Sequence, residues 1–65
     1  MKPIDFRAYI NLCKDRGLSE HQVAAMLGCG KNSLTRWKRY PAPHYIGLAI
    51  AALEANITPW SRSNV

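Results

Sequence analysis

The chain has 65 residues, of which nine are Lys or Arg and four are Asp or Glu, so its formal net charge is +5. This length allows one domain at most, and so short a chain buries only about 60% of its unfolded surface, which leaves little room for an enzyme's cleft beside the core. The 48% hydrophobic and 20% charged residues exclude a disordered basic tail, because such tails are poor in apolar residues.

The first predicted helix runs from Pro3 to Arg16, because apolar residues recur there at the three- and four-residue steps of one helical face. These residues are Phe6, Tyr9, Ile10 and Cys13. Proline suits the first turn of a helix, and Gly17 suits the left-handed conformation that ends one. We therefore expect a buried face, and opposite it an exposed face with the basic residues Lys2, Arg7, Lys14 and Arg16.

The second predicted helix begins at Glu20 and is ended by Gly28. Ser19 and Gln22 have the spacing of a capping box, in which each side chain bonds the backbone amide of the other residue. The helical period predicts a short buried stripe in this segment. The stripe consists of Val23, Met26 and Leu27, with the small Ala24 beside it.

The third predicted helix, from Lys31 to Arg39, follows after only three residues, so the second and third helices must cross steeply. Its end is set by Pro41, which disfavours a helical conformation at the preceding Tyr40. Gly30 precedes this helix and offers no side-chain oxygen as a cap, although glycine is tolerated at that position.

The fourth predicted helix runs from about Pro43 to Ala55, after which Asn56 can adopt the left-handed conformation and Ile57 can fold back on Leu53. Pro59 prevents the helix from resuming. The sequence therefore predicts an all-α fold, a compact bundle of four short helices. We assign residues 1–60 to one domain and residues 61–65 to a flexible tail.

The fourth segment carries no charge from residue 45 to residue 53, so both faces of this helix are apolar. One face can join the core, and the other presents small residues at four-residue steps, which permit close approach by another helix. These small residues are Gly47, Ala51 and Ala55. We interpret them as the interface of a homodimer. The alternative is that Ile57 and Trp60 cover them within the same chain.

The string LSEHQVAAMLGCGKNSLTRWKR, residues 18–39, resembles the helix-turn-helix of the Cro/CI-type repressor family without a gap. The positions that carry the resemblance are Leu18, Ser19, Ala24, Gly28, Cys29, Leu34 and Trp37. Two positions depart from the family pattern: Glu20, where a glutamine often bonds a DNA phosphate, and Gly30, where Ser or Thr often caps the next helix. The resemblance implies a lambda repressor-like DNA-binding domain of a phage or bacterial regulator, with its motif at about residues 19–39.

The third segment also predicts DNA contact without the family. Leu34 and Trp37 share one helical face, and the opposite face is polar and basic without an acid. Asparagine can pair with adenine and arginine with guanine in the major groove. We therefore predict base contacts by Lys31, Asn32, Thr35 and Arg36. Phosphate contacts, which position the domain, are predicted for Ser33, Lys38, Arg39 and Tyr40.

Several of these residues have a simpler interpretation. A basic helix face can be merely solvated, and Tyr40 can do no more than shape the loop beside Pro41. Trp37 is interpreted as a core residue rather than as a platform for a base, because it lies beside Leu34. His21, at the exposed start of its helix, is more simply solvated than in contact with a phosphate.

Neither a cofactor nor a metal site is expected. The two cysteines and two histidines show no metal-ligand spacing, and the four acids lie far apart in sequence, so no catalytic carboxylate pair is visible. We interpret Cys13 and Cys29 as reduced thiols. No segment is a predicted membrane span or signal peptide, so we expect a protein of the bacterial or phage-infected host cytoplasm. No small-molecule effector is evident.

These patterns together predict a non-enzymatic, sequence-specific binder of double-stranded DNA. It would act as a small transcriptional regulator, a repressor that occupies a two-fold operator as a homodimer. The alternative, from another class, is a protein-interaction module or DNA-binding subunit in a phage or toxin-antitoxin assembly. In that alternative the fourth helix is the partner surface.

Overall fold

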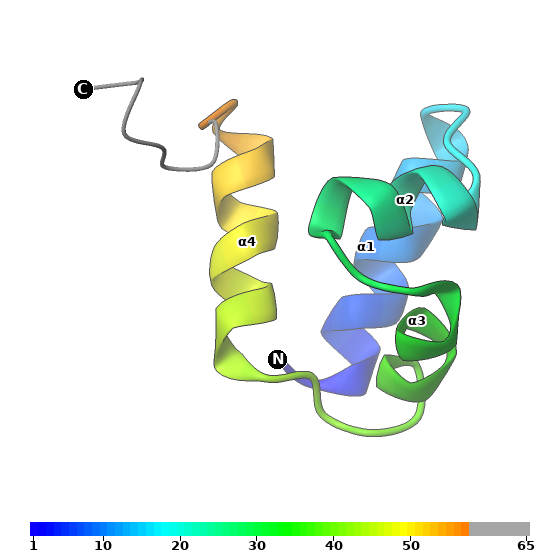
Figure 1. Cartoon of the computed structure of the whole chain (residues 1–65), viewed down its shortest axis with the longest axis vertical. Coiled ribbons are helices and arrows are strands. Elements are labelled where there is room, and N and C mark those ends of the chain that lie inside the picture. Colours follow the sequence, from blue (N-terminus) through cyan, green and yellow to red (C-terminus); the bar gives the residue numbers. More distant parts are fainter. Residues whose placement is uncertain (58–65) are drawn as a thin grey trace.

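The computed structural model describes residues 1–57, and this range contains four α-helices and no β-strand. The predicted all-α class is therefore confirmed. The helices are α1 (Pro3–Asp15), α2 (Glu20–Leu27), α3 (Lys31–Trp37) and α4 (His44–Glu54). Figure 1 shows α4 along one side of the group formed by α1, α2 and α3. Pro59, Trp60 and the predicted tail 61–65 lie outside the described residues.

The start of α2 and the ends of α1, α2 and α4 follow the local sequence signals. The Ser19 side chain accepts a hydrogen bond from the Gln22 amide at 3.2 Å, and the Ser19 amide donates to the Gln22 side chain at 2.8 Å. This is the predicted capping box. Gly17, Gly28 and Asn56 adopt positive φ angles of 82°, 71° and 57°. Each therefore ends its helix in the expected left-handed conformation.

One hydrophobic core joins all four helices. The predicted face of α1 is buried, and the buried residues of the other elements pack against it. At its centre the rings of Phe6 and Trp37 meet edge to face, with 5.8 Å between their centroids. The remaining buried residues are Tyr9, Ile10, Cys13, Val23, Ala24, Leu34, Ala42, Ile46 and Ile50. Trp37 is therefore a core residue, as the sequence predicts.

The predicted stripe of α2 is wrong at Met26, whose side chain is 42% exposed. At about 100° per residue, Val23, Ala24 and Leu27 lie within one arc of the helix, and Met26 lies at the edge of that arc. Val23 and Ala24 are buried and Leu27 is half-buried. The buried face of α2 is therefore rotated about the helix axis relative to the predicted face, toward Ala24 and away from Met26.

The third helix ends at Trp37 and not at the predicted Arg39. The amides of Arg39 and Tyr40 both donate to the Arg36 carbonyl, at 3.0 Å and 2.9 Å, so the backbone tightens into a turn directly after the helix. Proline at position 41 disfavours a helical conformation at Tyr40 and cannot donate a backbone hydrogen bond itself, so it predicts that the helix stops by residue 40 but not how early. The loop that follows pairs with the N-terminus, where the Ala42 amide donates to the Met1 carbonyl at 2.9 Å.

Candidate nucleic-acid interface

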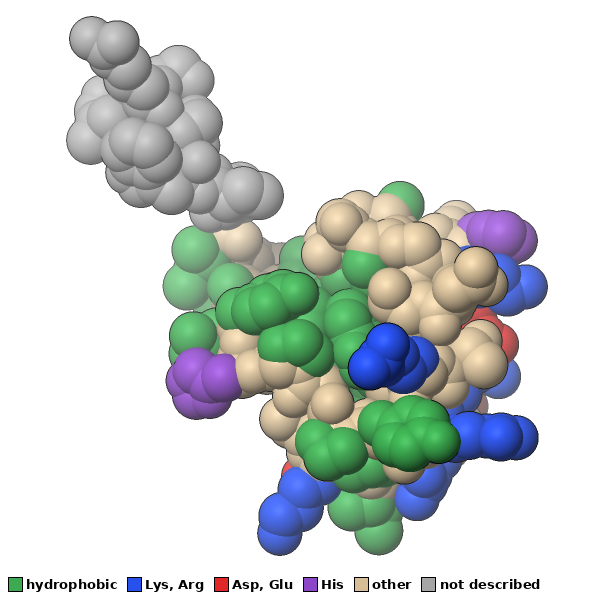
Figure 2. All heavy atoms as spheres, turned by 60° about the horizontal axis from the view of Figure 1, so that its bottom comes forward, with side chains coloured by type: hydrophobic (Ala, Val, Ile, Leu, Met, Phe, Trp, Pro, Cys, Tyr) green, Lys and Arg blue, Asp and Glu red, His purple; other side chains and the backbone are tan. Residues whose placement is uncertain are grey.

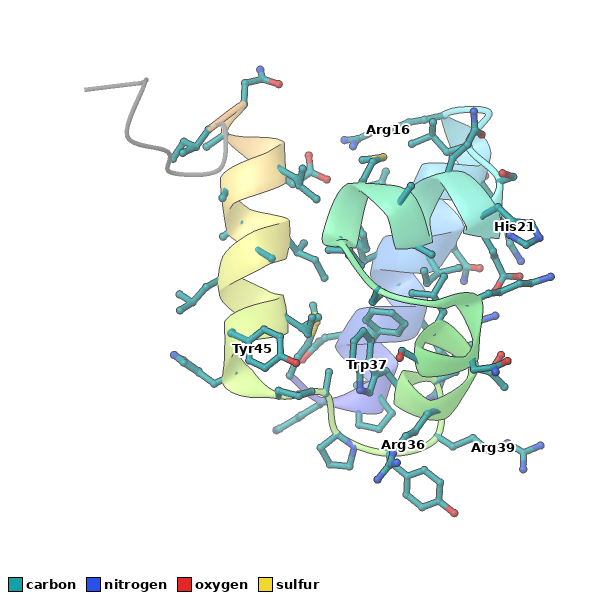
Figure 3. All side chains as sticks on the ribbon, viewed as in Figure 1. Arg16, His21, Arg36, Trp37, Arg39 and Tyr45 are labelled. Carbon is teal, nitrogen blue, oxygen red and sulfur yellow. The ribbon has the colours of Figure 1, made fainter. Side chains whose placement is uncertain are left out.

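The outer face of α3 is open to solvent because its inner face is anchored in the core. Leu34 is 0% exposed and Trp37 is 8% exposed. All four predicted base-contacting residues are exposed, and they are Lys31, Asn32, Thr35 and Arg36. In Figure 3, Trp37 points into the molecule, whereas Arg36 and Arg39 lie at its lower edge and point outward. The structure therefore brings the predicted base-contacting residues together on one accessible surface, and their contact with DNA stays a prediction.

The four predicted phosphate-contacting residues have different surroundings. Arg39 and Tyr40 are exposed, Tyr40 to 61%. Ser33 and Lys38 are half-buried. The Lys38 ammonium group already donates to a Glu20 carboxylate oxygen at 2.5 Å. Arg39 and Tyr40 are thus accessible as they stand, whereas Lys38 would have to leave a carboxylate to reach a phosphate.

Glu20 is the centre of a small charged cluster that we call the Glu20 cluster: Lys14 of α1, Glu20 of α2 and Lys38. One Glu20 carboxylate oxygen bonds Lys38, and the other lies 3.7 Å from the Lys14 ammonium nitrogen. The hydrogen bond from Lys38, together with the nearby positive charges, lowers the pKa of the Glu20 carboxyl despite partial burial of the group. Glu20 and Lys38 are 18 residues apart, so no local pattern in the sequence predicts this cluster.

Arg7 of α1 is a second residue that no sequence pattern connects to α3. Its guanidinium donates to the Lys38 carbonyl at 2.6 Å, at the end of α3 where helix carbonyls lack partners. A cation at a helix C-terminus also interacts favourably with the helix dipole. Arg7 therefore holds the end of α3 against α1. The two residues are 31 positions apart, so only the folded chain reveals the contact.

All the charged side chains of α3 and of the turn that follows it are positive. Residues 31–40 include four Lys or Arg and no Asp or Glu. In the view of Figure 2, Lys and Arg side chains (blue) are spread over the right and lower parts of the molecule, and few Asp or Glu side chains (red) are visible among them. Such a surface attracts a polyanion at long range. The Glu20 cluster is the place where an acid from another helix reaches this basic region.

The outward side of α4 differs in detail from the predicted small-residue strip. Ala51 and Ala55 are exposed, but Gly47 is half-buried, and a Cβ atom built on it would lie 4.0 Å from Met1. The larger apolar side chains that α4 exposes are Tyr45 at 64% and Leu48 at 59%. Between α4 and α2 lies an apolar groove of about 390 Å³, lined among others by Met26, Ala49, Leu53 and Ile57.

Both cysteines of the chain are free thiols, and Cys13 is buried to 1% exposure. Burial also raises the pKa of the half-buried Cys29 thiol, and a raised pKa lowers the reactive thiolate fraction. We expect two thiols per chain after unfolding without reductant, and slow labelling of both thiols in the folded protein. Titration with a chromogenic thiol reagent measures this. Fewer than two thiols, or zinc bound in equal amount to the purified protein, would contradict the interpretation of both residues.

Comparisons with protein-family models, with curated proteins and with solved structures found no match to this chain. The class of protein is therefore defined by the fold alone, which is all-α. Within residues 1–57, no helix combines the length and the apolar character needed to cross a membrane.

Proposed function

We propose that this chain binds double-stranded DNA in a sequence-specific manner, with α2 and α3 as a helix-turn-helix. The observation that carries the proposal is the two-sided character of α3. Leu34 and Trp37 fasten one side to the core, and the other side offers Asn32, Thr35 and Arg36 to solvent. A short, rigidly anchored helix with amide, hydroxyl and guanidinium groups on its free side suits the major groove.

The proposed mechanism is occupancy of an operator. Asn32 and Arg36 would read base edges, and Arg39 and Tyr40 would contact phosphates at the end of the helix. A protein bound in this way hinders polymerase without any chemical step, so we propose a small transcriptional repressor that is not an enzyme. We also propose that it acts in the cytoplasm of a bacterium or of a phage-infected cell, without cofactor or effector.

DNA binding is tested by titrating a fluorescent random-sequence duplex with the protein across a series of salt concentrations. We expect binding that weakens as salt rises, with a slope of log affinity against log salt of roughly −2 to −4, as two to four phosphate contacts require. A duplex that stays unbound at about 50 mM salt would contradict the proposal.

Dimerisation through α4 is part of the proposal, because half-sites of a two-fold operator need two recognition helices. Its support is the exposed apolar surface of α4, namely Tyr45 and Leu48 next to the small residues Ala51 and Ala55. Large apolar side chains that are exposed together on a small protein mark an interaction surface. Gly47, which Met1 partly covers, contributes less of this surface than the sequence predicts.

Ala51→Glu is expected to shift the protein from dimer to monomer, because it places an unpaired charge in the proposed contact. Such a charge costs about 3 kcal/mol or more, which is over a hundredfold in the dissociation constant. Sedimentation velocity measures the change, with Ala8→Glu, an exposed position on α1, as the matched control. A wild-type chain that is monomeric at tens of micromolar, both free and on DNA, would show that α4 is not a dimer interface.

A second candidate function rests on the same surface. The apolar groove between α2 and α4 and the exposed side chains of α4 also fit a protein-interaction module in a phage or toxin-antitoxin assembly. In that case α4 binds a different protein, and DNA contact is incidental. The two candidates differ in one outcome, since only the regulator selects particular sequences from a mixture of duplexes.

A further inference from the structure

The Glu20 carboxylate lies between two ammonium groups, one from each of two neighbouring segments. Its two oxygens are 2.5 Å from the Lys38 nitrogen and 3.7 Å from the Lys14 nitrogen. The side chains of Glu20 and Lys38 are only 23% and 28% exposed, so this pair is better shielded from solvent than an ordinary surface pair. A DNA phosphate presents the same chemistry as this carboxylate, an anionic pair of oxygens that accepts hydrogen bonds from lysine.

The position of the cluster matters as much as its charge. Lys38 follows α3 directly and is the chain neighbour of Arg39, which is exposed. We expect a DNA backbone that reaches Arg39 to pass near Lys38, whose ammonium group the Glu20 carboxylate already holds. Ion pairs near the surface add little to stability, and α2 and α3 are already joined by buried side chains, among them Val23 and Leu34.

We propose that Glu20 is an internal competitor for DNA phosphates, which occupies Lys38 and Lys14 and so weakens the sequence-independent part of binding. This inference rests on the proposed DNA-binding function. Phosphate contacts supply most of the affinity for random sequence, whereas base contacts supply the discrimination. A carboxylate that withdraws two lysines from the phosphates therefore increases the share of binding that depends on Asn32 and Arg36.

The test is Glu20→Gln, which keeps the size of the side chain, removes its charge and replaces one acceptor oxygen with an NH2 donor. Because a neutral glutamine at this position can itself donate to a phosphate, the salt slope decides the test, since it counts the phosphates that cations neutralise. A gain in affinity at an unchanged salt slope would overturn the inference. At about 0.15 M salt, each additional lysine that binds a phosphate raises affinity roughly fivefold and steepens the salt slope by about 0.9. We expect the variant to bind at least one more phosphate in this way, on random and on preferred duplexes alike. The ratio between the two affinities then stays the same.

The matched control is Glu54→Gln, which makes the same change in net charge at the ion pair of Glu54 with Arg16, where nitrogen and oxygen are 2.9 Å apart. Figure 3 places Arg16 at the opposite end of the molecule from Arg36 and Arg39. This control therefore changes the total charge without freeing a lysine near α3. We expect it to raise affinity less than twofold and to leave the salt slope unchanged.

A double variant identifies the lysine that is released. Glu20→Gln combined with Lys38→Gln is expected to lose most of the increase in affinity, and its salt slope is expected to return toward the wild-type value. Helicity and melting temperature are recorded for every variant. If the amide variant unfolds, Glu20→Ala replaces it, because Glu20 is the first residue inside α2 and alanine has the highest helix propensity.

The outcomes separate the inference from the function on which it rests. If the wild type binds duplexes and Glu20→Gln binds them equally or more weakly, the inference is overturned and DNA binding stands. An equal increase in affinity for Glu54→Gln overturns it too, because net charge alone then explains the effect. If neither the wild type nor Glu20→Gln binds any duplex at about 50 mM salt, the proposed function fails, and the inference fails with it.

Discussion

Phe6→Ala is expected to unfold the protein at room temperature. Phe6 is 0% exposed and meets Trp37 edge to face across the centre of the core. Truncation of a buried phenylalanine to alanine costs about 3 to 5 kcal/mol, because transfer energy is lost and a cavity is left. The core of a domain of this size rarely supplies more than about 3 to 5 kcal/mol in total, so little or no stability remains.

The measurement is far-ultraviolet circular dichroism during thermal and urea unfolding. Ile4→Ala is the control, since Ile4 lies on the same helix but is 65% exposed, and substitutions at such surface sites usually stay within about 0.5 kcal/mol. We expect the control to melt like the wild type. A cooperative melt of Phe6→Ala within about 1 kcal/mol of the wild type would show that Phe6 does not stand at the centre of the core.

Arg36→Ala and Asn32→Ala are expected to weaken binding to the preferred duplex by about 1 to 3 kcal/mol, with a smaller effect on random sequence. Both side chains are exposed on the outer face of α3, where a base edge can be reached. Each variant should flatten the preference at one base pair of the site. Fluorescence anisotropy on both duplexes across a salt series measures the difference.

Arg39→Ala provides the contrast, because Arg39 lies past the end of α3 and is exposed there. It should weaken all duplexes about equally and reduce the salt slope by about 0.9, as the loss of one phosphate contact requires. Lys38→Ala is a poorer contrast, because Lys38 is held by Glu20. If Arg36→Ala lowers both affinities by the same factor, Arg36 is a phosphate contact and the predicted base-reading face is wrong.

Much of the fold could be predicted because its signals are local. A capping box needs only Ser19 and Gln22, and the glycine and asparagine ends need only one residue each. The buried face of α1 follows from spacing within one helix. Each of these features spans a few residues, so the chain specifies them without reference to its tertiary structure.

The rest of the site depends on contacts between residues that lie far apart in the sequence. Arg7 reaches the end of α3 and Glu20 reaches Lys38 only after the helices have packed. The exposure of Met26 depends on which arc of α2 meets its neighbours, and the cover over Gly47 depends on where the N-terminus lies. A residue's charge or size is visible in the sequence, but the partner that neutralises or covers it is not.

The central claim, that α3 reads DNA sequence, is tested most directly by selecting bound duplexes from a random library at moderate salt. The exposed Asn32, Thr35 and Arg36 predict enrichment of a short motif, and the proposed dimer predicts that its two halves are related by two-fold symmetry. Arg36→Ala should then remove the preference at one position in each half. Recovery of no enriched sequence from a library that the protein does bind would contradict the claim and favour the protein-interaction module.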